Sequence, residues 1–412
     1  MDVFGNLYIS DSNNQRIRKV GSNGIITTVA GNGINNYGGD GGAATNASLS
    51  VPNGLAANEF GHLFIVDAGN NVIRQVDSHE LITTVAGNGP DYPGDGEAAT
   101  NVELNGPTGV AVDSTGDMFI AEYFGNHIRK VGINGIISTA AGNGNYGYSG
   151  DGGAATNASI ANPTAVTTDA SGDLFIADTG NSLIRKVDMA GIISTVAGGG
   201  SDYPGDGETA TNVSLNNPQG VTVDVFGNLF IADTVNNVIR RMDAQGFITT
   251  VAGNYNYAYS GNGGPATNAS IANPENVTTD ASGNLFIADA GNNRVRKVVF
   301  QGPTLVLNGV TFGNAGTYDL VVSNPYGSVT SSVINLTVTL PVVLSAPQIT
   351  EGKTNFIFLL SGPAGSNYVL QVSTNLLNWS SVSTSTIPVS GTKTLTNAIT
   401  GYNRRFYRAI IP

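Results

Sequence analysis

The chain of 412 residues carries a formal net charge of −12, with 12% charged residues, 55 glycines and no cysteine. The acidic balance argues against binding of nucleic acid, which needs clustered lysine and arginine. The absence of cysteine excludes disulfides, thiol catalysis and cysteine-based metal sites. No apolar run of about 20 residues is present, so the sequence predicts no membrane span.

One phrase of strand-forming residues recurs six times along the chain. Each copy starts 55 or 56 residues after the previous one. The copies are GNLYISDSNNQRIRKV (5–20), GHLFIVDAGNNVIRQV (61–76), GDMFIAEYFGNHIRKV (116–131), GDLFIADTGNSLIRKV (172–187), GNLFIADTVNNVIRRM (227–242) and GNLFIADAGNNRVRKV (283–298). A repeat of this length predicts a repeat architecture rather than a single irregular domain.

Each full unit divides into four short strands, which we name a to d. Strand a is typified by PTGVAVD (107–113), strand b by LFIAD, strand c by IRKV and strand d by IITTVAG. Alternating β-branched residues between turns rich in Gly, Asn and Asp indicate strands. Four-stranded units of this length predict the blades of a β-propeller, in which a closed ring buries both faces of each blade.

A longer period of two blades indicates how many blades there are. DVFGNL occurs at 2–7 and again at 224–229, with the related DSTGDM at 113–118, so the spacing is 111 residues each time. Three such pairs predict an all-β, six-bladed propeller over residues 1–303. The first blade lacks strand a, which leaves an edge unpaired. Residues 303–308 either complete the sixth blade or begin the next module.

These motifs resemble a known family. Residues 1–298 are similar to NHL-repeat propellers of the bacterial type, which carry TVAGNG, GDGG-x-AT and P-x-G-V-x-x-D between blades. The resemblance is specific for the fold and weak for function, because one architecture hosts many functions. Met1 falls inside a repeat, and a secretory leader is expected only upstream of it.

The remaining residues predict two small β modules. Residues 304–340 resemble the second half of an Ig-like domain, in which Tyr318 would form a tyrosine corner. Residues 341–412 resemble a C-terminal β-sandwich module of secreted bacterial proteins, which implies a secreted or cell-surface location. Trp379 is the only tryptophan and is expected in the core of this module.

The long connections from strand d to the next strand a are the first candidate site. They reach the same face as the b–c turns, and connections of about 20 residues are often functional. Tyrosine rings there would suit a polar ligand such as a glycan, although each loop could instead pack its own ring. The tyrosines are Tyr37, Tyr92, Tyr146, Tyr148, Tyr203, Tyr255, Tyr257 and Tyr259.

A repeated acid and a repeated arginine form the second candidate set. An acidic residue ends each strand b, and an arginine follows in strand c; a metal or anion site is one interpretation. The other is structural, with the acid capping the b–c turn and the arginine joining blades. The clearest members are Asp67, Asp178, Asp233, Asp289, Arg74, Arg185, Arg240 and Arg296.

The start of strand a supplies a third, asymmetric set at the predicted mouth of the central channel. The residues after the strand-a prolines are Asn53, Thr108, Thr164, Gln219 and Glu275. Oxygen ligands of this kind take calcium, although a single carboxylate would bind it poorly. Calcium is therefore the one cofactor that the sequence suggests, by analogy with lactonase-like propellers.

Enzyme signatures are scarce. His62, His79 and His127 fall at different repeat positions, so they are expected at the surface rather than in one zinc site. No G-x-S-x-G, H-E-x-x-H or P-loop motif is present. The sequence predicts a non-catalytic extracellular binding scaffold whose loop face contacts a polysaccharide or a protein. The alternative is a lactonase- or lyase-like enzyme with a central metal.

Overall fold

The computed structural model describes residues 1–300 throughout and divides the chain into two units, Met1–Gly302 and Pro303–Pro412. Within the second unit it describes the backbone of four short strands between 316 and 336. It also describes 343–410 except for 350–354, 363, 366 and 399–404. Each unit is treated separately below.

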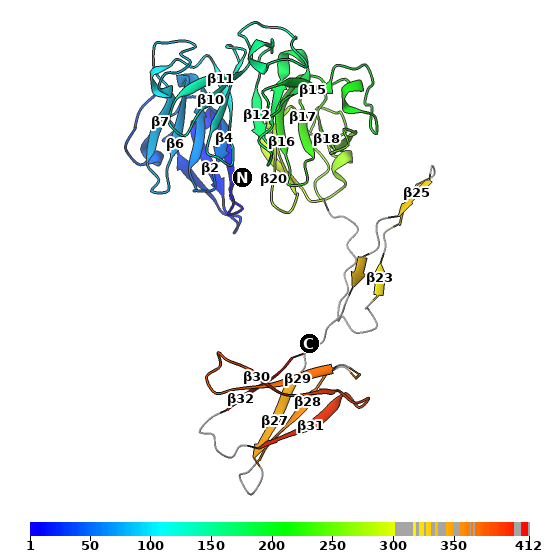
Figure 1. The fold of residues 1–412 in the computed structure, drawn as a ribbon. Helices are drawn as coiled ribbons and strands as arrows, with labels where there is room; N and C mark the ends of the chain where they lie inside the picture. The colour runs from blue at the N-terminus through cyan, green and yellow to red at the C-terminus, as the bar shows by residue number, and fades with distance from the viewer. Residues whose placement is uncertain are drawn as a thin grey trace. The chain divides into compact units, whose positions relative to one another are not determined.

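The first unit is the propeller that the repeat predicts (Figure 1). Its antiparallel sheets follow one another along the chain, and strands a to d lie in that order within a sheet. The first and the last sheet along the chain have three strands each, and each of the four sheets between them has four strands. The strands are β1 (Leu7–Asp11), β2 (Arg16–Val20) and β3 (Ile26–Ala30); β4 (Pro52–Ala57), β5 (Leu63–Asp67), β6 (Val72–Val76) and β7 (Ile82–Gly87); β8 (Pro107–Val112), β9 (Met118–Glu122), β10 (His127–Val131) and β11 (Ile137–Ala141); β12 (Ala165–Thr168), β13 (Leu174–Asp178), β14 (Leu183–Val187) and β15 (Ile193–Gly198); β16 (Pro218–Val223), β17 (Leu229–Asp233), β18 (Val238–Met242) and β19 (Ile248–Ala252); β20 (Pro274–Thr279), β21 (Leu285–Asp289) and β22 (Arg294–Val298).

Alternation along strand b builds the core between neighbouring sheets. In β9, Met118 and Ile120 pack in a cluster with the preceding sheet, whereas Phe119 and Ala121 pack in a cluster with the following one. Successive side chains of a strand point to opposite faces, so one strand serves two interfaces. All residues of strand b are consequently buried in the four-stranded sheets.

The inner strands β4, β12, β16 and β20 lie near the centre of the unit in Figure 1, and β8 packs between β4 and β12. Three of them, β4, β8 and β16, approach the next inner strand closely because each carries a glycine. A Cβ atom on Gly109 would lie 2.6 Å from the carbonyl oxygen of Thr164 and 2.9 Å from the Cα of Ala165. Gly54 and Gly220 meet the next inner strand in the same way. These glycines set the width of the central channel.

The connections divide the unit into two faces. Strands b and d end at one face, which also holds the b–c turns and the d–a loops; we call it the loop face. The a–b and c–d turns lie at the other end of the strands, and we call that end the turn face. Short 3₁₀ turns order the d–a loops: Ala44–Asn46, Ala99–Asn101, Ala155–Asn157, Ala210–Asn212 and Ala266–Asn268. Others lie in the b–c turns: Ser12–Asn14, Ala68–Asn70, Thr179–Asn181 and Ala290–Asn292.

The two three-stranded sheets are less covered than the others. Every residue of β1 is partly exposed, and no residue of β22 is buried. Residues 303–308, which could complete the last sheet, lie outside the described part of the chain. Closure of the ring therefore stays a prediction.

The second unit contains two three-stranded sheets, β27–β28–β31 and β30–β29–β32. They enclose a small core that includes Phe358, Leu360, Tyr368 and Leu370. Their bounds are β27 (Val343–Ile349), β28 (Asn355–Ser361), β29 (Asn367–Ser373), β30 (Ser380–Thr386), β31 (Thr392–Ala398) and β32 (Phe406–Ile410).

The segment that resembles an Ig-like half contributes two strand pairs, β23 with β26 and β24 with β25. Their bounds are β23 (Gly316–Tyr318), β24 (Val321–Asn324), β25 (Gly327–Thr330) and β26 (Ile334–Leu336). The tyrosine corner predicted at Tyr318 lies outside the described side chains. In the described parts of both units, no helix has the length and apolar character that crossing a membrane requires.

Candidate functional site

The loop face is built by contacts between a d–a loop and the b–c turn of the next sheet. The side-chain amides of Asn70, Asn181 and Asn292 donate hydrogen bonds of 3.1, 2.8 and 2.9 Å to carbonyl oxygens of the preceding loop. The same asparagines donate to the acid that ends strand b. These three loops are thereby held against the next sheet.

A buried arginine in strand c completes this attachment. Arg74 is fully buried; its Nη1 lies 3.3 Å from Asp67 at the end of β5, and its Nη2 lies 2.5 Å from Asp40 in the preceding loop. Asp40 also accepts the backbone N–H of Thr84 in β7. A shift in the pairing of β6 with β7 occurs beside Arg74, and such bulges redirect side chains. One arginine thus joins two strands and a loop.

The same unit recurs with small differences in the other four-stranded sheets. Arg185 pairs with Asp178 and with Asp151, and Arg240 lies 3.0 Å from Asp206 and 4.0 Å from Asp233. Two further members depart from it: Arg129 pairs with Glu122 and Asp95, whereas Arg296 pairs with Asp289 and has Asn262 where the other loops have an acid. The repeated acids and arginines therefore contact one another in a structural arrangement.

The pKa values of the two kinds of carboxyl group in this unit shift in opposite directions. Loss of hydration raises the pKa of Asp67 and Asp178, and it raises the pKa of Asp233 to about 6. Burial also disfavours ionisation of Asp40 and Asp151. Hydrogen bonds from a threonine and the arginine charge outweigh that effect and lower the pKa of both. The loop carboxylates therefore neutralise the buried guanidinium groups most effectively.

Three of the predicted loop tyrosines belong to this structural unit. The guanidinium of Arg74 lies 5.0 Å from the ring centre of Tyr37, and Arg185 lies 4.9 Å from that of Tyr148. Their hydroxyls donate to the loop acids Asp40 and Asp151, at 3.1 and 3.0 Å. Tyr259 is equivalent: Arg296 lies 4.9 Å from its ring centre, and its hydroxyl accepts from Asn262.

Tyr92 belongs to a second structural cluster, which breaks the repeat. Its hydroxyl lies 3.0 Å from Nδ1 of His127, whose ring lies 3.8 Å from Glu122. The asparagine of the other b–c turns is replaced by Gly125, and a Cβ there would meet the Tyr92 hydroxyl at 2.6 Å. Burial and the charge of Glu122 raise the pKa of Tyr92 to about 12.

The expected surface position of the histidines is wrong for His127. It is 9% exposed, and burial together with Arg129 lowers its pKa. Tyr92 and Glu122 surround it because Glu is one methylene longer than the Asp of the other sheets. His79 is exposed, and His62, which is partly buried, contacts Gln75. Both lie in turns of the turn face, so the three histidines do not meet.

Three tyrosines on consecutive loops are open to solvent and have no hydroxyl hydrogen bond to another described residue. Tyr146, Tyr203 and Tyr257 are 66, 55 and 62% exposed and follow β11, β15 and β19. Tyr203 packs edge-on against Tyr255, which is partly buried and bonds to Thr250. In the loop after β3, Asn35 takes the position of Tyr146 and Tyr257. These three rings therefore lie on neighbouring loops of the loop face.

The channel residues share one cavity of about 620 Å³ that is lined from all six sheets. Asn53, Gln219 and Glu275 line it; Thr108 and Thr164 do too, and their hydroxyls bond to backbone carbonyls of the next strand a. Glu275 is exposed to the channel, yet the surrounding wall excludes enough water to raise its pKa. Among the described residues no three acidic or histidine side chains gather as metal ligands. Calcium stays a prediction.

The second unit holds a further pocket that the sequence did not predict. Trp379 is partly exposed and lines a cavity of about 350 Å³, so its expected place in the core is wrong. It follows a turn after β29 rather than lying within a strand, which removes it from the sheet interface. The aromatic residues of β28 and β32 are the only sequence signal for this pocket. They did not predict it, because aromatic residues in strands are equally consistent with a buried core.

Comparisons with known proteins agree with this fold. The chain is 29% identical over 317 residues to Protein SUPPRESSOR OF QUENCHING 1, chloroplastic, of Arabidopsis thaliana, covering 72% of this chain and 30% of that protein. It is 28% identical over 279 residues to Teneurin-4 of Mus musculus, covering 58% of this chain and 10% of that protein. The chain thus spans less than a third of either relative.

A solved structure of a Bacteroides thetaiotaomicron protein of unknown function superposes with a TM-score of 0.51 at 17% identity, covering 71% of this chain and 66% of that one. This likeness concerns the fold alone. The sequence profile described as the Teneurin NHL domain matches residues 33–91, 90–148, 143–203 and 199–260. These overlapping matches extend over more than half of the chain. The chain therefore belongs to the Teneurin NHL domain family.

Proposed function

We propose that the propeller is a non-catalytic extracellular binding scaffold, and that its loop face takes up a polysaccharide. The observation that carries the proposal is the group of exposed rings on consecutive loops, Tyr146, Tyr203 and Tyr257. A tyrosine ring offers an apolar face to a sugar and a hydroxyl at its edge. These loops are fixed by the buried arginines, so little ordering free energy would be lost on binding.

The asymmetry of these rings separates them from the structural tyrosines. Tyr37, Tyr148 and Tyr259 repeat every second sheet and use their hydroxyls within the loops. The exposed rings have no hydroxyl hydrogen bond to another described residue, and among the three Tyr203 alone packs against another loop ring, that of Tyr255. A side chain that the fold does not use is the better candidate for ligand contact.

Affinity electrophoresis of residues 1–412 in gels that contain one soluble polysaccharide each tests this proposal. A panel of neutral β-glucan, xylan, mannan and an anionic alginate covers the main backbone chemistries. We expect retardation in at least one gel and a loss of affinity of about tenfold or more in a Tyr146→Ala/Tyr257→Ala variant. Phe226→Ala is the matched control, because it removes an equally exposed ring (73%) from the turn face.

Migration unaffected by every polysaccharide, or equal affinity in the variant and the parent, would overturn the polysaccharide proposal. A protein ligand would then be the next candidate for the same face. The gels are run with calcium and with chelator. Binding that requires calcium would bring the channel residues Asn53, Gln219 and Glu275 into the ligand site. It would also favour the alternative of an enzyme with a central metal.

A further inference from the structure

We propose that the C-terminal module binds a small carboxylate that carries an aromatic or branched apolar group, in the pocket beside Trp379. This inference goes beyond the function proposed for the propeller and does not depend on it. The pocket has a volume of about 350 Å³, within the range of small-molecule sites. Its wall is formed mainly by Leu344, Phe356, Phe358, Trp379, Phe406 and Tyr407.

The aromatic wall is fixed before any ligand arrives. The indole N–H of Trp379 donates to the carbonyl oxygen of Leu376 at 3.1 Å. The guanidinium of Arg408 lies 4.3 Å from the Trp379 ring centre and donates through Nε to Gln371 at 2.8 Å. Stacking of a guanidinium on an indole stabilises both groups. The ring thus keeps its orientation, and an apolar ligand group would pack against a rigid surface.

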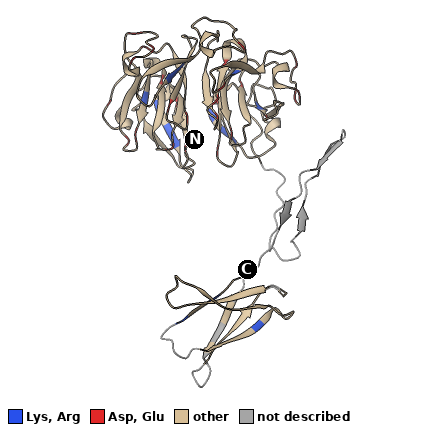
Figure 2. Ribbon diagram, in the orientation of Figure 1, with Lys and Arg blue, Asp and Glu red and all other residues tan. Residues whose placement is uncertain are grey.

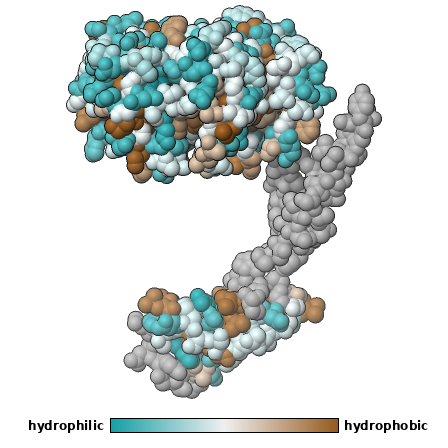
Figure 3. All heavy atoms as spheres, turned by 45° about the horizontal axis from the view of Figure 1, so that its top comes forward, coloured by the Kyte–Doolittle hydropathy of each residue, from teal (hydrophilic) through white to brown (hydrophobic). Residues whose placement is uncertain are grey.

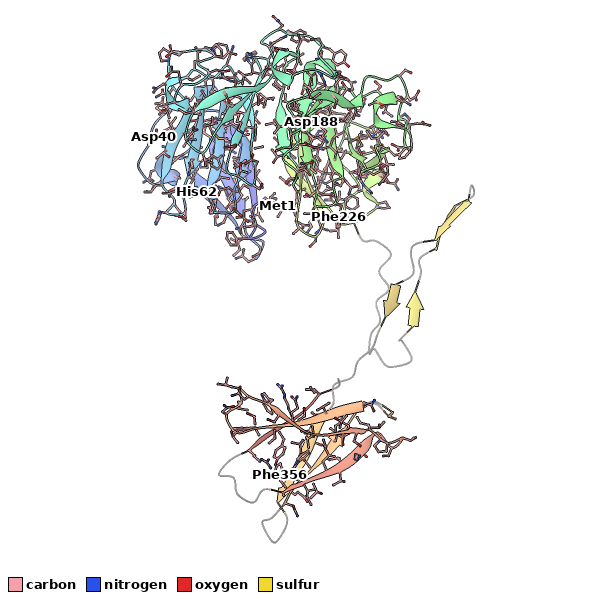
Figure 4. The ribbon with its side chains drawn as sticks, viewed as in Figure 1. Met1, Asp40, His62, Asp188, Phe226 and Phe356 are labelled. Carbon is pink, nitrogen blue, oxygen red and sulfur yellow. The ribbon has the colours of Figure 1, made fainter. Side chains whose placement is uncertain are left out.

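A second stack forms the floor of the pocket. The rings of Phe356 and Tyr407 lie parallel with their centres 5.5 Å apart, and Phe358 contacts both. The hydroxyl of Tyr407 is buried and has no hydrogen-bond partner within the described part of the chain. A buried donor without a partner costs free energy that a ligand oxygen would recover. Figure 4 labels Phe356 in this module.

The sequence of the module contains more basic than acidic residues, which favours an anionic ligand. Residues 341–412 contain five Lys or Arg residues and one Glu, although the whole chain has a net charge of −12. Figure 2 shows no acidic residue on the described part of the module. Arg405 lines the pocket and donates through Nη1 to Ala398 at 2.9 Å, which fixes its position. A guanidinium beside aromatic rings suits a carboxylate on an apolar group.

The entrance is apolar and offers a matched pair of substitutions. Leu376 lines the pocket and is 55% exposed, whereas its neighbour Leu377 is 82% exposed and does not line it. Apolar patches are visible on the described surface of the module in Figure 3. Neither leucine belongs to the core cluster of the module, so we expect either substitution to leave the fold intact.

Intrinsic fluorescence of the full chain tests the proposal, because Trp379 is the only tryptophan. The probe is 3-phenylpropionate, and its neutral amide is the control for charge. We expect a saturable change in emission with the acid and affinity at least about tenfold weaker for the amide. Leu376→Ala should weaken binding of the acid several-fold, whereas Leu377→Ala should match the parent. Arg405→Gln should remove the preference for the acid over the amide.

Free N-acetyltryptophanamide, titrated in parallel, corrects for collisional quenching. The peptide Gly-Gly-Phe and its C-terminal amide distinguish the source of the carboxylate. Tighter binding of the peptide acid than of phenylpropionate supports the C-terminus of a polypeptide as the ligand, and the reverse order supports a free acid. Emission that never saturates, equal affinity for acid and amide, or equal effects of the two leucine substitutions would each overturn the proposal.

Discussion

At the scale of single residues, the buried guanidinium groups explain why the loops hold their shape. Arg185 is fully buried, and two carboxylates from different elements compensate its charge. Removing one partner of a buried ion pair is costly because it leaves an uncompensated charge. The loop acid therefore attaches its d–a loop to the next sheet.

Replacing that acid should destabilise the propeller. We expect Asp151→Asn to lower the free energy of unfolding by roughly 2–4 kcal/mol, because Arg185 keeps only Asp178 as a charged partner. The last loop offers the reverse substitution: Asn262→Asp would supply the missing acid beside Arg296, whose side chain is 11% exposed. Urea unfolding followed by circular dichroism should show a higher or an unchanged free energy of unfolding for Asn262→Asp. A loss of stability in Asn262→Asp would contradict this account of the loop acid.

The same acid predicts how stability depends on pH. The folded protein lowers the pKa of Asp151 below its ordinary value of 3.8, so the folded state binds this proton less readily than the unfolded state. The stabilisation is present above the unfolded pKa of 3.8 and is lost as the pH falls through the lowered pKa of the folded state. Thermal unfolding between pH 2.5 and 6 should show a smaller acid-dependent loss in Asp151→Asn than in the parent. If the melting temperatures of the two proteins fell in parallel as the pH is lowered, Asp151 would not contribute to the acid dependence.

Tyr92 and Tyr203 occupy equivalent loop positions but differ in their hydroxyl contacts. The Tyr92 hydroxyl contacts the buried His127, whereas that of Tyr203 has no hydrogen bond to another described residue. Tyr92→Phe should therefore cost about 1–2 kcal/mol, because it leaves a buried polar group unpaired. Tyr203→Phe should be nearly neutral. Differential scanning calorimetry of both variants measures the difference, and equal melting temperatures would show that the cluster does not stabilise the fold.

At the scale of elements, the close approach of β4, β8 and β16 to the next inner strand rests on one glycine in each of them. A Cβ on Gly109 would lie within 3 Å of the backbone of β12, so that backbone must move. The equivalent position in β12 is Ala165, which indicates that a small shift can be accommodated. Gly109→Ala should fold and lose about 2 kcal/mol through overpacking.

Gly38 gives the control for this substitution. Its backbone is not in the left-handed region, and a Cβ would have no heavy atom within 4 Å. Gly38→Ala should leave the urea midpoint unchanged. A Gly109→Ala variant as stable as the parent would mean that the inner strands are further apart than the structure has them.

The strands were predictable because their signal is local and repeated. Alternation in LFIAD and β-branched residues in IITTVAG specify strands without reference to any partner. The attachment of the loops was not predictable in this way, because Asp40 and Arg74 are 34 residues apart and a GDG sequence reads as a turn. His127 was misjudged for a similar reason: its burial depends on Gly125 and Tyr92 together, and neither residue alone signals it.

At the scale of the whole propeller, the two faces differ in their chemistry. The loop face presents tyrosine, asparagine and aspartate besides apolar side chains such as Phe124 and Ile34, whereas the tips of the turn face present mainly aliphatic and phenylalanine side chains. These are 68–80% exposed and stand at the tips of the turns: Val3, Phe4, Phe60, Ile133, Met189, Val225 and Phe226. Brown patches follow the lower margin of the propeller in Figure 3, and Figure 4 labels Phe226 at its lower edge.

Exposed apolar tips lower solubility without contributing to the core. Val225 and Phe226 form one a–b turn whose backbone is held by Asp224, which accepts the N–H groups of Phe226 and Asn228. Neither apolar side chain is needed for that turn. We expect Val225→Ser/Phe226→Ser to raise the ammonium sulfate concentration at half precipitation and to leave the melting temperature unchanged within about 1 °C.

Tyr146→Ser/Tyr257→Ser gives the matched control on the loop face. Removing these rings exchanges amphipathic groups rather than purely apolar ones, so the gain in solubility should be smaller. Retention of polysaccharide binding in the Val225→Ser/Phe226→Ser variant, with loss in the tyrosine variant, would assign binding to the loop face. A drop in melting temperature on replacing Val225 and Phe226 would instead mean that these side chains pack against the propeller. Their exposure could not then explain any change in solubility.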